Sequence, residues 1–196
     1  HPPANWVPYS GWILEHLVAG EAIVPTPTVL AERGLVAEAG GFDESLALGE
    51  DYDLWFRLAT RAQAIAVDRR LATIRRHQGR SSHGRAREAH ECSMWSLRKV
   101  LQSAVDRGVR RACRRQLAYH AARLADVYSA EGEHWSAVGT FSAGVRYHPG
   151  RAALWRVLPK LLLRPVTPRW LWSLYRRFKD RGIAPRGEDP RPRAQG

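Results

Sequence analysis

The sequence has little sulfur and no long apolar run. Its 196 residues include two cysteines, Cys92 and Cys113, and one methionine, Met94. Two cysteines without paired spacing exclude a disulfide framework and a cysteine zinc site, so we expect a reducing compartment. No apolar run approaches the roughly 18 residues of a membrane-spanning helix, and no basic-then-apolar start indicates a signal peptide. Because the only methionine is internal, we expect a further segment before His1.

The composition predicts a packed protein with two electrostatic halves. Apolar residues make up 44% of the chain and eight tryptophans are present, which excludes disorder along its whole length. The net charge of +12 is uneven: residues 1–66 carry −6, and residues 67–196 carry +18. A basic surface of this kind binds either anionic membranes or nucleic acid.

Apolar spacing in the first 83 residues predicts a mixed α/β segment. Helical spacing covers 9–23, 32–39 and 50–61, and Gly40-Gly41 stops the second helix. The prolines in 24–30 suit an edge strand or a loop. Residues 62–75 alternate in part, as a strand does. Beyond Gly84 the pattern is helical, with breaks near 107–108, 131–132, 148–149 and 163–168 that delimit about five helices.

One part of this helical region, residues 117–155, resembles a single tetratricopeptide hairpin, which needs neighbours for stability. Residues 181–196 are rich in Arg, Pro and Gly and predict a disordered tail. We therefore expect three parts: 1–83, an α/β unit; 84–181, an all-α region with that hairpin; and 182–196, a basic tail.

The most informative stretch runs from Gly40 to Ser82. Its elements, in chain order, are Gly40-Gly41-Phe42-Asp43-Glu44, then Glu50-Asp51-Tyr52-Asp53-Leu54 with Arg57, then Arg75, His77, Ser81 and Ser82. This order resembles the C-terminal half of the catalytic domain of family-two glycosyltransferases, which are inverting enzymes of GT-A fold. The resemblance covers about residues 1–83 and departs at Ile74, where the family usually has tyrosine. It implies a partial GT-A fold of the α/β class.

The resemblance also implies a nucleotide-binding half that this sequence lacks. No glycine-rich phosphate loop follows a strand, and the only Asp-x-Asp triplet, Asp51-Tyr52-Asp53, lies in the wrong part of the pattern. We therefore expect an incomplete donor site, and no turnover by this chain alone.

The resemblance assigns a role to each residue of the motif. Asp51 is the base that takes the proton of the acceptor hydroxyl, because a hydroxyl is a poor nucleophile without one. Glu50 and Trp55 are assigned to acceptor binding. The leaving diphosphate needs a cation or basic groups. Arg75 and Arg76 are assigned to that diphosphate, and His77 to a divalent metal, manganese or magnesium.

Each of these assignments has a simpler alternative. Acidic residues at a helix start are commonly a solvated cap that the helix dipole favours. A lone histidine beside arginines is ordinarily a solvated loop residue. Aromatic residues such as Trp55 and Phe56 belong to a core more often than to a sugar-stacking surface. Gly40 and Gly41 agree with either interpretation, since a helix stop needs them too.

Two functions from different classes follow. The first is an inverting glycosyltransferase that moves a sugar from a nucleotide-sugar donor to a glycan or lipid-linked acceptor, here without its nucleotide-binding half. The alternative is a non-catalytic helical interaction module with a degenerate transferase remnant. Arginine recurs evenly without a nucleic-acid fingerprint, so we do not expect nucleic acid as a partner. Residues 155–178 have the composition of interfacial helices, and we expect a cytoplasmic protein with peripheral contact to the membrane's cytoplasmic face.

Overall fold

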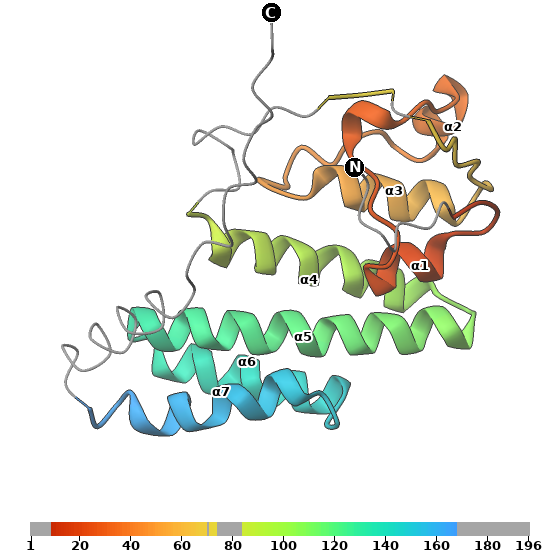
Figure 1. Cartoon of the computed structure of the whole chain (residues 1–196). Helices are drawn as coiled ribbons and strands as arrows, with labels where there is room; N and C mark the ends of the chain where they lie inside the picture. The colour runs from red at the N-terminus through yellow and green to blue at the C-terminus, as the bar shows by residue number, and fades with distance from the viewer. Residues whose placement is uncertain (1–8, 70, 74–83, 168–196) are drawn as a thin grey trace, which may run out of the picture.

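The computed structural model describes residues 9–69, 71–73 and 84–167, and its regular elements there are helices (Figure 1). In chain order they are α1 (Leu14–Ala19), a 3₁₀ turn η1 (Thr26–Thr28), α2 (Arg33–Glu38), α3 (Glu50–Ala59), α4 (Ala86–Ser103), α5 (Arg107–Glu131), α6 (His134–Tyr147) and α7 (Ala152–Leu163). Helices α2 and α3 lie on one side of α4 and α5 to α7 lie on the other, while α1 lies beside the end of α4 and packs against α5 (Figure 1).

Helix α5 is the centre of the described chain. It packs against α4, α6, α7 and α1. One core cluster contains residues from α1, α3, α4 and α5. It therefore includes residues from both sides of the predicted boundary at position 83. A second core cluster joins α5 to α6 and α7, and there the α5 face consists of Ala118, Ala122 and Ala125, all fully buried. Small side chains on this face let the neighbouring helices approach closely.

The ends of α5 follow ordinary capping chemistry. The Asp106 carboxylate accepts a hydrogen bond of 2.9 Å from the Val109 amide, as an N-cap does. At the other end Gly132 adopts a left-handed conformation with φ of 88°, which glycine reaches without steric cost. The tight turn at Gly132 and Glu133 reverses the chain into α6. The break before α5 therefore lies at 104–106, slightly earlier than the predicted break at 107–108.

The predicted α/β fold is wrong for the described residues. No strand or sheet occurs among them, and the nearest feature is an isolated antiparallel bridge between Gly11 and Ala64, with N to O distances of 2.8 and 2.9 Å. Residues 62–69 alternate as a strand would, yet Ile65 is 88% exposed. A strand needs backbone partners along its length, and Gly11 pairs with one position only. The structure therefore does not support a GT-A half.

The helical predictions agree better with the structure. Helices α2 and α3 fall inside 32–39 and 50–61, and α2 is followed by Gly40 and Gly41 with φ of 86° and 65°. The helix predicted over 9–23 is shorter, because Gly20 ends α1 with φ of 74°. Residues 24–30 contain the 3₁₀ turn η1 at Thr26–Thr28, which agrees with the loop alternative and not with the edge strand. The prediction of an all-α region is confirmed over 84–167, where four helices are described.

Two expectations remain predictions. The tetratricopeptide resemblance of 117–155 coincides with the antiparallel pair α5 and α6 and the start of α7, while the tail 182–196 lies outside the described residues. Of the described helices, none is both long and apolar enough to cross a membrane.

Candidate functional site

The carboxylate of Asp51 lies at the start of α3 and is partly exposed. Gly49 precedes the helix in a left-handed conformation with φ of 75°, so the chain turns sharply into the first helical residue, Glu50. The Thr26 hydroxyl in η1 donates to Asp51 Oδ2 over 2.9 Å, and the Tyr52 amide donates to Oδ1 over 2.8 Å. These two bonds hold the carboxylate in one orientation, and each oxygen keeps acceptor capacity for another donor.

Asp53 has a different environment although it is only two residues away. Its side chain is 2% exposed. Arg57 Nε donates to Asp53 Oδ2 over 2.9 Å, and Lys99 Nζ from α4 lies 2.8 Å from Oδ1. A buried carboxylate with two cationic partners is satisfied and inaccessible. Asp53 therefore anchors α3 to α4 and is not available to a substrate.

The segment from the glycine pair to Phe42-Asp43-Glu44 contacts the same two basic residues, Arg57 and Lys99. Arg57 also donates to the carbonyl of Ala39, the residue before Gly40. Lys99 Nζ also lies 3.4 Å from Asp43 Oδ2. The Ser45 hydroxyl donates to Asp43 Oδ1 over 2.6 Å, and this bond, aided by Lys99, lowers the pKa of Asp43. Much of the motif's spacing is thus explained by ion pairing between the 39–45 turn, α3 and α4.

The two residues predicted to bind an acceptor lie in different surroundings. Glu50 is exposed beside Asp51 at the helix start. Trp55 is 7% exposed, belongs to the core, and meets Phe42 edge to face with ring centroids 6.4 Å apart. Its indole Nε1 is buried and has no hydrogen-bond partner within the described residues. The structure therefore brings Glu50 and Asp51 together and places Trp55 beneath them in the core.

The predicted donor-side residues, Arg75, Arg76 and His77, lie outside the described residues. Within 9–69, 71–73 and 84–167 no group of three or more His, Cys, Asp or Glu side chains could hold a metal ion. The Asp51 carboxylate instead accepts hydrogen bonds from the Thr26 hydroxyl and the Tyr52 amide. Asp51 therefore belongs to no such acidic or histidine group among the described residues.

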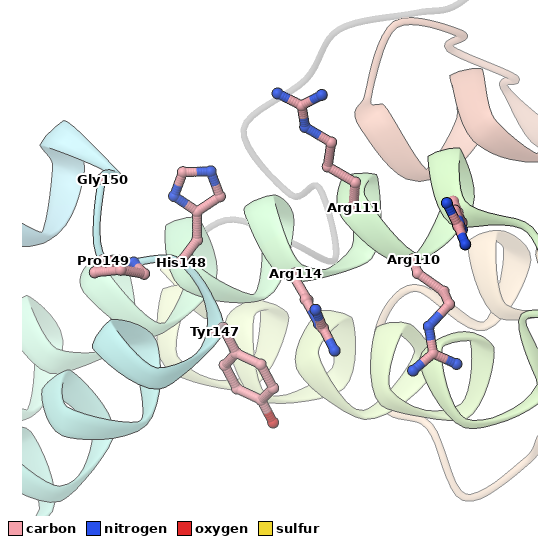
Figure 2. Close-up of a pocket in the computed structure, with 8 residues that line it drawn as sticks. Arg110, Arg111, Arg114, Tyr147, His148, Pro149 and Gly150 are labelled. Carbon is pink, nitrogen blue, oxygen red and sulfur yellow. The ribbon is translucent and has the colours of Figure 1, made fainter.

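Sequence reasoning missed Thr26 and Lys99, which come from distant segments, and it missed two hollows. One, of about 540 Å³, lies between α3 and α4 beside Asp53, Arg57 and Lys99. The other, of about 420 Å³, lies where the first two turns of α5 face the loop after α6 (Figure 2). The arginines of that second hollow recur every three or four residues, and this spacing was the one available signal.

Comparison with known proteins adds no relative: no family model, no curated protein and no solved structure matches this chain.

Proposed function

We propose that this chain carries the acceptor side of an inverting, nucleotide-sugar-dependent glycosyltransferase, with Asp51 as the general base. The observation that carries the proposal is the contrast within the Glu50-Asp51-Tyr52-Asp53 segment. Asp53 is buried in ion pairs, whereas Asp51 is partly exposed and oriented by Thr26. An oriented, accessible carboxylate at a helix start is what a general base requires. The order of motif residues from Gly40 to Ser82 supplies the chemical class.

The reaction is a single displacement. The acceptor oxygen forms a bond to the anomeric carbon while the bond from that carbon to the diphosphate oxygen breaks. The bonding electrons leave with the nucleoside diphosphate, and the acceptor proton passes to the carboxylate of Asp51. The exposed Glu50 beside it would accept a hydrogen bond from another acceptor hydroxyl.

The donor side of the proposal rests on the motif alone. Arg75 and Arg76 would bind the diphosphate, and His77 would bind manganese or magnesium, which would neutralise charge on the leaving group. The acceptor is a glycan or a lipid-linked glycan. We place the protein in the cytoplasm, with peripheral contact to the membrane's cytoplasmic face, because exposed apolar residues, Leu162, Leu163 and Val166, cluster in and just after the last turn of α7.

The test is an Asp51→Asn variant of the protein encoded by the full reading frame that contains this chain. Release of nucleoside diphosphate is measured with a panel of nucleotide sugars and acceptors. The amide keeps the shape of Asp51 but cannot take a proton, so the rate should fall by about a hundredfold to ten-thousandfold. Donor binding should stay nearly unchanged. The 196-residue chain alone should release no nucleoside diphosphate above blank.

The matched control is Asp68→Asn, the same chemical change at an exposed acid that is not one of the named motif residues. It should leave the rate at the wild-type level. An Asp51→Asn protein that retained more than about a tenth of the wild-type rate would remove Asp51 from the role of base.

A second candidate function is a non-catalytic helical interaction module. The observation in its favour is Trp135, which is 89% exposed at the start of α6, with the exposed Val138 one turn later. Exposed aromatic side chains of this kind are common in protein interfaces. The reading frame upstream of His1 separates the two functions. Alternating strands and helices ending in an Asp-x-Asp motif would favour the transferase, and further helical repeats would favour the module.

A further inference from the structure

We propose that the hollow between α5 and the loop after α6 binds a phosphate-bearing ligand. This inference concerns the helical region and does not rest on the role of Asp51. Arg107, Arg110, Arg111 and Arg114 line the hollow from α5, and Tyr147 at the end of α6 and His148 in the loop line it from the other side. Its volume of about 420 Å³ falls within the range of roughly 300–1,000 Å³ that small-molecule sites occupy.

The spacing of the arginines places four guanidinium groups on neighbouring turns of one helix. Residues three and four apart lie next to each other on a helix surface, so each of the four has two like-charged neighbours. Figure 2 shows Arg110, Arg114 and Tyr147 pointing to one side of α5, and Arg111 and His148 to the other. The residues that line the hollow therefore present cationic groups on two sides of α5.

Two carboxylates, Glu15 beside Gly108 and the cap Asp106, lie at the first turn of α5, but neither forms an ion pair with the arginines of the hollow in the described structure. No acidic side chain lines it, and no ion pair joins its four arginines to a carboxylate within the described residues. The nearby Asp106 carboxylate caps α5, and Arg110 donates to the Ala104 carbonyl over 3.2 Å. Some arginines elsewhere are paired: Arg87, for example, contacts the carboxylates of Glu91, Glu131 and Glu133. The hollow differs from that site because four arginines are grouped there without a carboxylate partner in the described residues.

The loop side adds an unsatisfied polar group. Nδ1 of His148 is buried and has no hydrogen-bond partner in the described part of the chain. Arg98 on α4 donates to the Tyr147 hydroxyl over 3.2 Å and so holds this side chain of the hollow in place. Arginine forks bind phosphate oxygens in a bidentate manner, and phosphate is a stronger acceptor than any neutral group. These features select an anionic phosphate group over a neutral or cationic ligand.

Two sources of phosphate share this chemistry, a soluble diphosphate and the headgroup of an anionic lipid. The soluble arm of the test titrates inorganic pyrophosphate into the 196-residue chain by calorimetry at a constant ionic strength of about 0.15 M. The lipid arm measures flotation with phosphatidylcholine vesicles, with and without phosphatidylglycerol. Saturable binding in the first arm identifies a soluble ligand, and binding only to the anionic vesicles identifies a headgroup. Either result supports a phosphate site.

The decisive variant is Arg110→Gln with Arg114→Gln. Because charge-assisted bonds are lost, affinity should fall by at least about tenfold in whichever arm shows binding. The matched control, Arg33→Gln with Arg156→Gln, removes the same charge from exposed positions on α2 and α7. It should change affinity by no more than about twofold. Binding in neither arm, or an equal loss in both double variants, would overturn the proposal.

Discussion

At the scale of single residues, Asp51 and Asp53 show how one acidic segment divides into two roles. Both lie in the first turn of α3, where the helix dipole favours negative charge. Tertiary neighbours then separate them, since Thr26 holds Asp51 at the surface and Lys99 with Arg57 holds Asp53 in the interior. The buried ion pairs of Asp53 stabilise the fold, whereas the carboxylate of Asp51 stays accessible at the surface.

Asp53→Asn should therefore destabilise the protein far more than Asp51→Asn does. The first change leaves Arg57 and Lys99 without their shared carboxylate, at a cost on the order of 2–3 kcal/mol, reduced from a fully buried pair because both cations are partly exposed. The second removes a partly exposed charge and should cost less than about 1 kcal/mol. Urea unfolding followed by circular dichroism measures both. Equal losses would contradict the structural role of Asp53.

At the scale of elements, a pair of histidines joins α4 to α5. His90 Nδ1 and His120 Nδ1 are 3.1 Å apart, so one ring donates and the other accepts. Burial lowers the pKa of His120 to about 4, with help from His90. Burial, with help from the charge of Arg123, also lowers the pKa of His90. The pair is therefore neutral in the folded protein near neutral pH.

The sign of the pH dependence follows from these directions. Between pH 6.5 and about 4 the unfolded chain binds a proton at His120 that the folded chain does not, so the free energy of unfolding rises with pH in this window. Stability present above pH 6.5 should be lost as the pH falls toward 4, by on the order of 1–2 kcal/mol. His120→Gln, which does not titrate, should flatten the difference in unfolding free energy between pH 7 and pH 4.5. An unchanged slope in that variant would exclude His120 as the source.

The close approach of α6 to its neighbours gives a second test at this scale. A Cβ atom added at Gly144 would lie 2.6 Å from Leu154 Cδ2 on α7 and 3.0 Å from Ala121 Cβ on α5. Gly144→Ala should therefore destabilise the protein by about 1–3 kcal/mol through overpacking. Gly139, on the same helix, has no atom within 4 Å of that position. Gly139→Ala should instead stabilise by about 0.5–1 kcal/mol, because alanine favours a helix interior. Thermal unfolding distinguishes the two, and a stabilised Gly144→Ala would contradict this packing.

At the scale of the whole molecule, the acidic and basic halves of the sequence are not separate bodies in the described structure. Their apolar residues share one core cluster around α5. Polar contacts cross the same boundary: Lys99 pairs with Asp43 and Asp53, and Gln116 donates to the Ala19 carbonyl. Helix α5 contributes residues to both core clusters. A loss of its packing would therefore destabilise the motif region as well as the helical region.

The sequence by itself determined the features that depend on neighbours a few residues away. Apolar periodicity placed α2, α3 and the helices after Gly84, and Gly40 and Gly132 marked helix ends where glycine tolerates a positive φ, whereas the end of α1 at Gly20 was not predicted. The helical spacing over 50–61 also predicted that the acidic residues of this segment lie in the first turn of α3. These signals are local, so they can be recognised without knowing the fold.

Only the tertiary structure decided what depends on contacts between distant segments. The alternation in 62–75 predicted a strand, but strand formation requires a pairing partner, and in the described residues Gly11 pairs at a single position. The different roles of Asp51 and Asp53 depend on Thr26 and Lys99, which no spacing pattern connects to α3. Likewise, the arginines of α5 form a hollow only because the turn after α6 returns to face them. Long-range contacts determine which charges are buried, paired or left open, and those contacts are a property of the fold.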